Sequence, residues 1–166
     1  LFSGGSFGSG AHPTTQMCLT ALADFTTRES SVLDLGCGSG ALAIGAAKLG
    51  ARKVIAVDID QAAVIRTRDN AALNGVAAQI DVRLGSTVVA QPDGPFDIIA
   101  ANLLTPTILV LARDFPGILA PGGRIVLSGV LKTQVDRVQS ELESAGLRVL
   151  EARDQSGWSC LIVGAI

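Results

Sequence analysis

The most constraining feature of this sequence is a regular alternation of short apolar runs with helix-like segments from residue 31 onward. Five apolar runs predict strands, at 31–35, 53–57, 79–84, 96–101 and 124–128. Helices are predicted between or after these runs, at 40–49, 61–74, 105–119 and from 135 to a stop at Gly146. Because crossovers between parallel strands are right-handed, this alternation predicts an α/β fold with a doubly wound, mostly parallel sheet.

The segment before this alternation has a different character. Residues 1–10 are rich in glycine and serine and are expected to form a loop, and Thr14-Thr15 are expected to cap a helix that reaches about Asp24. We therefore divide the chain into a lid loop and helix at 1–30 and a ligand-binding unit at 31–166. One structural domain overall is expected, since 166 residues can bury a core.

The end of the chain departs from the parallel pattern. Apolar runs at 147–152 and 159–163 lie on either side of Ser156-Gly157, a turn-forming pair. They predict a C-terminal antiparallel hairpin added to the sheet.

Composition excludes several classes of protein. Apolar residues make up 48% of the chain and charged residues 17%, which excludes a disordered protein. No apolar run approaches the ~18 residues that a membrane span needs. A net charge of -2 provides no basic surface for direct binding of nucleic acid.

The cysteines and the first residues bear on cellular context. Cys18, Cys37 and Cys160 fit no metal-ligand spacing, and the chain has one histidine, so we expect reduced thiols, a cytoplasmic protein and no metal site. No signal peptide is recognised. Because the chain opens with Leu1 rather than Met, we expect a fragment of a longer protein or a chain whose first residues precede Leu1.

The strongest local motif is the run D-L-G-C-G-S-G at residues 34–40, which follows the first strand and opens a helix. Gly36, Gly38 and Gly40 permit a tight turn and let backbone N–H groups approach a ligand. Asp58 ends the second strand, where a carboxylate can accept hydrogen bonds from both hydroxyls of a ribose. The alternatives are an ordinary strand-to-helix turn and a solvated acid at a strand end.

The spacing of the glycines distinguishes two classes of cofactor. Dinucleotide enzymes favour G-x-G-x-x-G, with the pyrophosphate at the helix N-terminus. Here the spacing is G-x-G-x-G, and Asp34 precedes the first glycine. A carboxylate would repel a pyrophosphate but suits the ammonium and sulfonium groups of S-adenosylmethionine. We therefore predict that residues 31–166 form an S-adenosylmethionine-binding methyltransferase domain, in which Asp60 caps the helix from residue 61.

Three further segments resemble one family. F-G-S-G-A-H-P-T-T at 7–15, D-N-A-A-L-N-G at 69–75 and A-N-L-L at 101–104 are similar to the F-G-T-G-x-H-P-T-T, D-N-A-x-x-N-G and A-N-I-L segments of the ribosomal protein L11 methyltransferases, which are class I methyltransferases. The likeness covers nearly the whole chain. Ser9 stands where the family usually has Thr, and Thr105 where it usually has Ala.

The resemblance implies a cytoplasmic enzyme that methylates amino groups of a protein, on lysine side chains or the N-terminus, with ribosomal protein L11 as the expected partner. It also implies that Thr15, Gly36, Asp58 and Asn102 contact the cofactor. The family enzymes carry an N-terminal substrate-recognition domain, which we expect to be missing from these 166 residues.

Asn102 is the expected catalytic residue. It ends the fourth predicted strand, where its side-chain oxygen could accept N–H bonds from an amine and aim the lone pair. That amine must be neutral, although a free lysine has a pKa near ~10.4. The alternative role for Asn102 is to cap the next loop. The sequence after it, Leu103-Leu104-Thr105, lacks an aromatic residue to stack on a base, which disfavours a nucleobase substrate.

Three other residues have weaker claims to function. His12 is the single histidine and could be a general base, although the neighbouring proline and glycines favour a lid or structural role. Trp158 could line the entrance for the methyl acceptor or pack on the sheet. Cys37 is interpreted as a small filler of the loop.

Two alternative functions remain open, a small-molecule methyltransferase and a non-catalytic cofactor-binding module of the same fold. The intact glycines and Asp58 count against the second of these. The glycine spacing and Asp34 disfavour a dehydrogenase.

Overall fold

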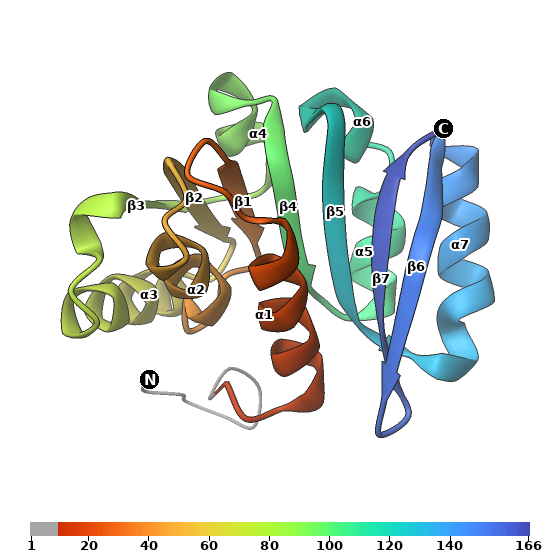
Figure 1. The fold of residues 1–166 in the computed structure, drawn as a ribbon, viewed down its shortest axis with the longest axis horizontal. Coiled ribbons are helices and arrows are strands. Elements are labelled where there is room, and N and C mark those ends of the chain that lie inside the picture. Colours follow the sequence, from red (N-terminus) through yellow and green to blue (C-terminus); the bar gives the residue numbers. More distant parts are fainter. Residues whose placement is uncertain (1–9) are drawn as a thin grey trace.

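The computed structural model describes residues 10–166, and within them one seven-stranded sheet carries helices on both faces (Figure 1). Its strands are β1 (Ser31–Leu35), β2 (Lys53–Asp58), β3 (Ile80–Leu84), β4 (Phe96–Asn102), β5 (Leu119–Leu131), β6 (Leu147–Gln155) and β7 (Trp158–Ala165). Its α-helices are α1 (Pro13–Phe25), α2 (Ala41–Lys48), α3 (Gln61–Leu73), α4 (Thr87–Ala90), α5 (Thr105–Leu111), α6 (Phe115–Ile118) and α7 (Val135–Ser144). Short 3-10 helices lie at Ala77–Gln79, Gln91–Asp93 and Lys132–Gln134.

The strand order confirms the predicted doubly wound sheet. It runs β3-β2-β1-β4-β5-β7-β6, with parallel pairing from β3 to β5 and antiparallel pairing of β7 with both of its neighbours. The chain moves outward from β1 to β3 and then returns to β4 on the other side of β1. In such sheets a ligand binds at the carboxyl ends of the strands where the order reverses, which here is between β1 and β4.

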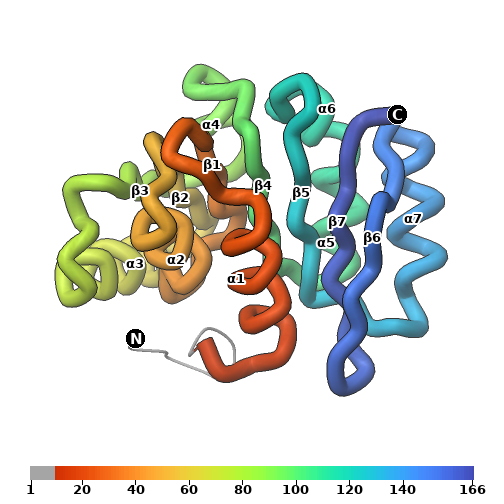
Figure 2. Tube along the Cα trace, viewed as in Figure 1, coloured from red at the N-terminus to blue at the C-terminus, as the bar shows by residue number. Residues whose placement is uncertain are grey.

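Two hydrophobic layers hold the helices to the sheet. On one face α1, α2 and α3 pack around residues such as Leu22 and Ala43, and on the other α5, α6 and α7 pack around residues such as Ile108 and Leu142 (Figure 2). Strand β1 is buried along its whole length because it contributes to both layers, with Val32 facing the first and Leu33 and Leu35 facing the second. The central strands are therefore packed on both faces, below the carboxyl edge at which a ligand is expected.

The first helix begins earlier than predicted. His12, not Thr14, is the N-cap residue of α1, and its Nδ1 accepts a hydrogen bond from the Thr14 backbone N–H at 3.3 Å. Pro13 explains the shift, since proline fits the first turn of a helix and lacks an N–H that would need a partner. Thr14 and Thr15 are consequently buried in the first turn. Of the loop expected at residues 1–10, residues 1–9, which include Ser9, lie outside the described residues.

The predicted helix at 105–119 is wrong in extent. It is divided into α5 and α6, and the next strand already begins at Leu119. Pro116 lies in the first turn of α6, and a proline cannot continue an α-helix that started eleven residues earlier. Pro121-Gly122-Gly123 then shifts the register between β4 and β5. The sequence prediction also missed α4, whose single turn is too short to show a periodic pattern.

The predicted C-terminal hairpin is confirmed as β6 and β7, joined at Ser156 and Gly157. Both turn residues have positive φ, 53° and 81°, as tight hairpin turns require. Strand β7 lies between β5 and β6, an order that the sequence pattern did not indicate.

Candidate functional site

The glycine loop lies at the carboxyl end of β1, beside the point where the strand order reverses. Gly36, Gly38 and Gly40 have φ angles of +77°, +57° and +82°, which only glycine adopts readily. A Cβ atom at Gly36 would also collide with the side chain of Leu103, the residue after β4. The Gly36 N–H donates to the carbonyl of Val57 at 2.9 Å, so the loop bends over the end of β2.

Asp58 connects this loop to the start of α3. Its Oδ2 accepts a hydrogen bond from the Gly38 N–H, and its Oδ1 accepts one from the Asp60 N–H, both at 2.9 Å. Each carboxylate oxygen can accept more than one bond, so the carboxylate retains capacity for ligand hydroxyls. Asp60 accepts from the Ala62 N–H at 2.8 Å, as an N-cap residue does.

Asp34 is a buried acid inside β1. Its Oδ2 accepts a hydrogen bond from the Ala43 N–H at 2.9 Å, which ties the strand to the first turn of α2. Burial raises the pKa of Asp34 to about 7, the Ala43 bond lowers it, and the negative charge of Asp58 raises it further. A cation placed next to Asp34 would favour the ionised form.

Asn102 ends β4, and its side-chain Nδ2 donates to Thr15 Oγ1 of α1 at 3.2 Å. Since the amide nitrogen is engaged with α1, the bond fixes the orientation of the amide and hence of its carbonyl oxygen. Residues far apart in the sequence are thereby joined across the edge of the sheet.

Most of the predicted site residues line one cavity. It has a volume of about 90 Å³ and is lined by Thr15, Asp34, Gly36, Cys37, Gly38, Ser39, Ala41, Leu42 and Asn102. Two predicted residues lie outside this lining. Gly40 is the N-cap residue of α2, and Asp58 lines a separate cavity on the other side of Gly36.

That second cavity was largely missed by the sequence analysis. It has a volume of about 190 Å³ and is lined by Leu35, Gly36, Asp58, Ile59, Gly85, Ser86, Leu103, Thr107 and Leu111. Ile59 is 81% exposed, so an apolar side chain lies open to solvent at this cavity. The sequence did indicate this cavity, because Ile59 follows β2 and Gly85-Ser86 follow β3. The carboxyl ends of parallel strands share one edge, so these residues are expected to lie close together.

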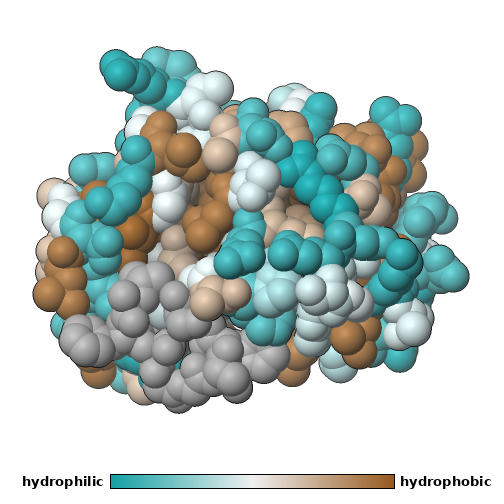
Figure 3. Space-filling model, turned by 60° about the horizontal axis from the view of Figure 1, so that its bottom comes forward, coloured by the Kyte–Doolittle hydropathy of each residue, from teal (hydrophilic) through white to brown (hydrophobic). Residues whose placement is uncertain are grey.

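Figure 3 turns the lower edge of Figure 1 toward the reader, and outside the grey atoms hydrophobic and hydrophilic residues alternate there in small groups.

His12 and Trp158 meet edge to face, with ring centroids 5.3 Å apart. His12 Nδ1 lies 2.8 Å from Thr14 Oγ1 and caps α1, and Trp158 packs against the hydrophobic layer of α1. These contacts give both rings a structural role.

Cys37 has the filler role that the sequence analysis assigned to it. Its Sγ accepts a hydrogen bond from Thr67 Oγ1 at 3.2 Å, and burial raises its pKa to about 12. The thiol is therefore neutral and a poor nucleophile. Thr105 stands where the family usually has Ala. Its hydroxyl donates to Gln134 at 2.8 Å, which links α5 to the segment before α7.

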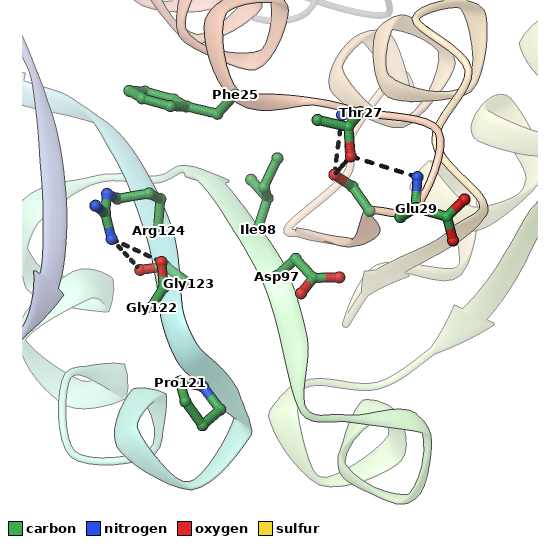
Figure 4. Close-up of a pocket in the computed structure, with 10 residues that line it drawn as sticks. Phe25, Thr27, Glu29, Asp97, Ile98, Pro121, Gly122, Gly123 and Arg124 are labelled. Carbon is green, nitrogen blue, oxygen red and sulfur yellow. Dashed lines mark hydrogen bonds between the residues drawn. The ribbon is translucent and has the colours of Figure 1, made fainter.

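A larger hollow, about 360 Å³, lies at the opposite edge of the sheet (Figure 4). It is formed by the segment after α1 and by the amino ends of β4 and β5. Arg124 is turned toward its own chain there and donates to the carbonyls of Gly122 and Gly123 at 2.7 and 3.0 Å. Its position at the amino ends of the strands separates it from the edge where doubly wound sheets bind cofactors.

The part of the chain from residue 10 to residue 166 contains no group of three or more His, Cys, Asp and Glu side chains arranged to hold a metal ion. Nor does it contain a helix that is both long and apolar enough to span a bilayer.

The strand order, the glycine loop after β1 and the acid at the end of β2 together define the class I methyltransferase fold. Within that class, the chain belongs to the ribosomal protein L11 methyltransferase family, whose model, "Ribosomal protein L11 methyltransferase (PrmA)", matches residues 1–165.

Individual relatives agree with this assignment. The chain is 42% identical to the ribosomal protein L11 methyltransferase of Geobacter metallireducens, over 99% of this chain and 54% of that protein. A crystal structure of a ribosomal protein L11 methylase from Lactobacillus delbrueckii subsp. bulgaricus superposes with a TM-score of 0.87 at 31% identity, over 94% of this chain and 80% of that chain.

A more distant structure, SMU.776 complexed with SAH, shares the fold with a TM-score of 0.74 at 14% identity, over 93% of this chain and 50% of that chain. The chain spans about half the length of the curated relatives it matches.

Proposed function

We propose that this chain is the catalytic part of an S-adenosylmethionine-dependent methyltransferase that acts on amino groups of ribosomal protein L11. The observation that carries the proposal is the pair of cavities that share Gly36 as a lining residue. The first includes polar side chains of β1, α1 and β4, and the second combines Asp58, Ser86 and Thr107 with apolar side chains. Such a division suits a ligand with a charged amino-acid end and a nucleoside end.

The residues of each cavity fit the corresponding part of the cofactor. Asp34 and the backbone of the glycine loop would hold the ammonium and carboxylate groups, and Thr15 also lines this cavity. Asp58 would accept hydrogen bonds from the ribose hydroxyls, and Ile59 and Leu103 would contact the faces of the adenine. The likeness of the fold to SMU.776, which is complexed with SAH, supports this choice of cofactor.

In the proposed mechanism, the bound cofactor supplies an electrophilic methyl group on its sulfonium. Asn102 orients the acceptor, because its Nδ2 is held by Thr15 and its carbonyl oxygen is left to accept an N–H bond from the amine. The amine would have to lose its proton to solvent before it presents its lone pair, and the new N–C bond would form as the bond from the methyl carbon to sulfur breaks, leaving a neutral thioether. Alignment of two reactants in this way is worth on the order of 7–11 kcal/mol in favourable cases.

The proposal includes a partner and a location. Because the curated relatives are about twice as long as this chain, we assign recognition of L11 to the part of their length that these 166 residues do not span. An enzyme that modifies a ribosomal protein would act in the cytoplasm, where ribosomes are assembled.

Calorimetric titration tests the cofactor. S-adenosylhomocysteine should bind with micromolar-range affinity and NAD should not bind, while Asp58→Ala should weaken binding by about tenfold or more through the loss of ribose hydrogen bonds. Transfer of a radiolabelled methyl group to purified L11 by the full-length protein tests the substrate. Binding of NAD alone would contradict the cofactor assignment, and labelling of small molecules but not of L11 would favour the small-molecule alternative.

A further inference from the structure

Helix α3 carries two fully buried polar side chains, Thr67 and Asn70, that line neither cavity of the proposed site. Asn70 belongs to the D-N-A-A-L-N-G segment, to which the proposed chemistry gives no role. Neither residue type favours a helix, and burying an amide or a hydroxyl is unfavourable unless it is hydrogen-bonded. Their position therefore indicates a specific partner.

That partner is the backbone of the glycine loop. Asn70 Nδ2 donates to the carbonyl of Ser39 at 2.8 Å. The Thr67 hydroxyl is within donating distance of the Gly38 carbonyl, at 3.3 Å, and of Cys37 Sγ, at 3.2 Å. Two consecutive loop carbonyls are thus within hydrogen-bonding distance of side chains of α3.

The loop needs such support because of its composition. Three of its five residues are glycines with positive φ, and glycine loses more conformational freedom on ordering than any other residue. Bonds that order the loop before a ligand arrives reduce the entropy that binding has to overcome. The contact is also tight, since a Cβ atom at Gly40 would lie 2.8 Å from Thr67 Cγ2.

The end of α3 is anchored in turn. The side chain of Asn74 donates to the carbonyl of Asn70 at 2.8 Å, and Gly75, with φ of +72°, ends the helix. Lys48, at the end of α2, donates to the carbonyl of Asn74 at 3.2 Å. Because α2 begins directly after the glycine loop, both ends of α2 are tied to α3.

We propose that Thr67 and Asn70 are positioning residues that hold the loop at 36–40 in its ligand-binding conformation and thereby set the affinity for the cofactor. This inference rests on the proposed function, because it takes S-adenosylmethionine as the ligand of that loop. The contribution is indirect, through the carbonyls of Gly38 and Ser39.

The test compares Asn70→Ala and Thr67→Val with the wild-type chain by calorimetric titration with S-adenosylhomocysteine. Each variant should bind about tenfold more weakly, because the loop would then have to be ordered at the expense of binding free energy. Hydrogen exchange of the amides at 37–40 should become faster in the free variants. Thr67→Ser, which restores the hydroxyl, should recover both the affinity and the slow exchange.

Ser31→Ala is the matched control. Its hydroxyl is also buried and donates to Asp97 at 2.8 Å, but at the amino edge of the sheet. This variant should lower the melting temperature and leave the affinity unchanged.

The possible outcomes separate the two proposals. If wild-type protein fails to bind S-adenosylhomocysteine, the proposed function is wrong. If it binds and the folded variants bind equally well, only the positioning role is overturned. Should Asn70→Ala fail to fold, the comparison of Thr67→Val with Thr67→Ser decides the question alone.

Discussion

At the scale of single residues, two carboxylates of the site differ in their surroundings. Asp34 lies inside a buried strand with one backbone N–H as its partner, whereas Asp58 lies at a strand end and accepts two. Burial favours the neutral acid at Asp34, so its charge state near neutral pH depends on what occupies the cavity beside it. Two residues of nearly the same chemistry can therefore serve different ends of one ligand.

Asp34 should make binding of the cofactor dependent on pH. A ligand ammonium group beside Asp34 favours its ionised form, so binding below about pH 7 requires loss of a proton. The affinity for S-adenosylhomocysteine should rise with pH, by at most about tenfold per unit, and level off above pH 7. Titrations between pH 5.5 and 8 measure this, and an affinity that does not vary with pH would contradict it.

The same acid should affect the stability of the free protein in the opposite sense. Its pKa in the folded state is raised from the ordinary value of 3.8 to about 7. Its favourable contribution to folding is therefore fully present below about pH 3.8 and is lost as the pH rises through 7. Asp34→Asn should make the melting temperature depend less on pH, which thermal melts of both proteins across that range measure. The variant should also bind the cofactor more weakly at pH 8.

Asn102 should matter more to catalysis than to folding. Asn102→Ala removes the oriented acceptor for the amine, and the rate of methyl transfer should fall by a factor on the order of 10²–10³. Its partly exposed side chain buries little apolar area, so the melting temperature should hardly change. Single-turnover methylation of L11 by the full-length protein at saturating cofactor is the measurement, and a wild-type rate in a folded variant would remove Asn102 from the mechanism.

At the scale of elements, the ends of β4 and β5 approach each other so closely that only glycine fits between them. Gly129 has a φ of +82°, and a Cβ atom there would collide with the backbone of Leu103. Gly129→Ala should destabilise the protein by roughly 1–3 kcal/mol through strain and displacement. It should also weaken binding of the cofactor, because Leu103 lines the second cavity.

Denaturant melts and calorimetry check this prediction, with Gly117→Ala as the control. A Cβ atom at Gly117 meets no neighbour within 4 Å, so that variant should keep both its stability and its affinity. Equal stability and equal affinity of the two variants would show that the contact between Leu103 and Gly129 does not exclude a Cβ atom.

The elements that sequence reasoning predicted well are those whose pattern is local. Alternating apolar runs located the central strands, and the glycine spacing located the loop. The errors arose where one residue overrode the pattern, as Pro13 and Pro116 did at helix ends. The place of β7 between β5 and β6, and the second cavity, depend on contacts between distant segments that no local pattern encodes.

At the scale of the whole molecule, the sheet separates two edges with different properties. The carboxyl edge gathers Asp34, Asp58 and Asn102 from three strands, although they are spread over 69 residues of sequence (34 to 102). The amino edge has a hollow of about 360 Å³, larger than either cavity described at the carboxyl edge, but none of these groups. The topology of the fold, rather than the size of a cavity, therefore locates the chemistry.

The chain as a whole should bind its cofactor well and methylate its protein target poorly. Both cavities of the proposed cofactor site are lined by residues within 10–166, whereas the chain spans about half the length of its curated relatives. Binding energy from a remote recognition domain normally serves to position the acceptor at the reacting centre. The 166 residues alone should thus match the full-length protein in affinity for S-adenosylhomocysteine and lose most of the kcat/KM for L11. A short lysine peptide, which has no remote contacts to lose, should be methylated equally slowly by both. If the 166 residues alone turned over intact L11 as efficiently as the full-length protein, recognition would have to reside in this domain, and the surface around Asn102 would be the place to look for it.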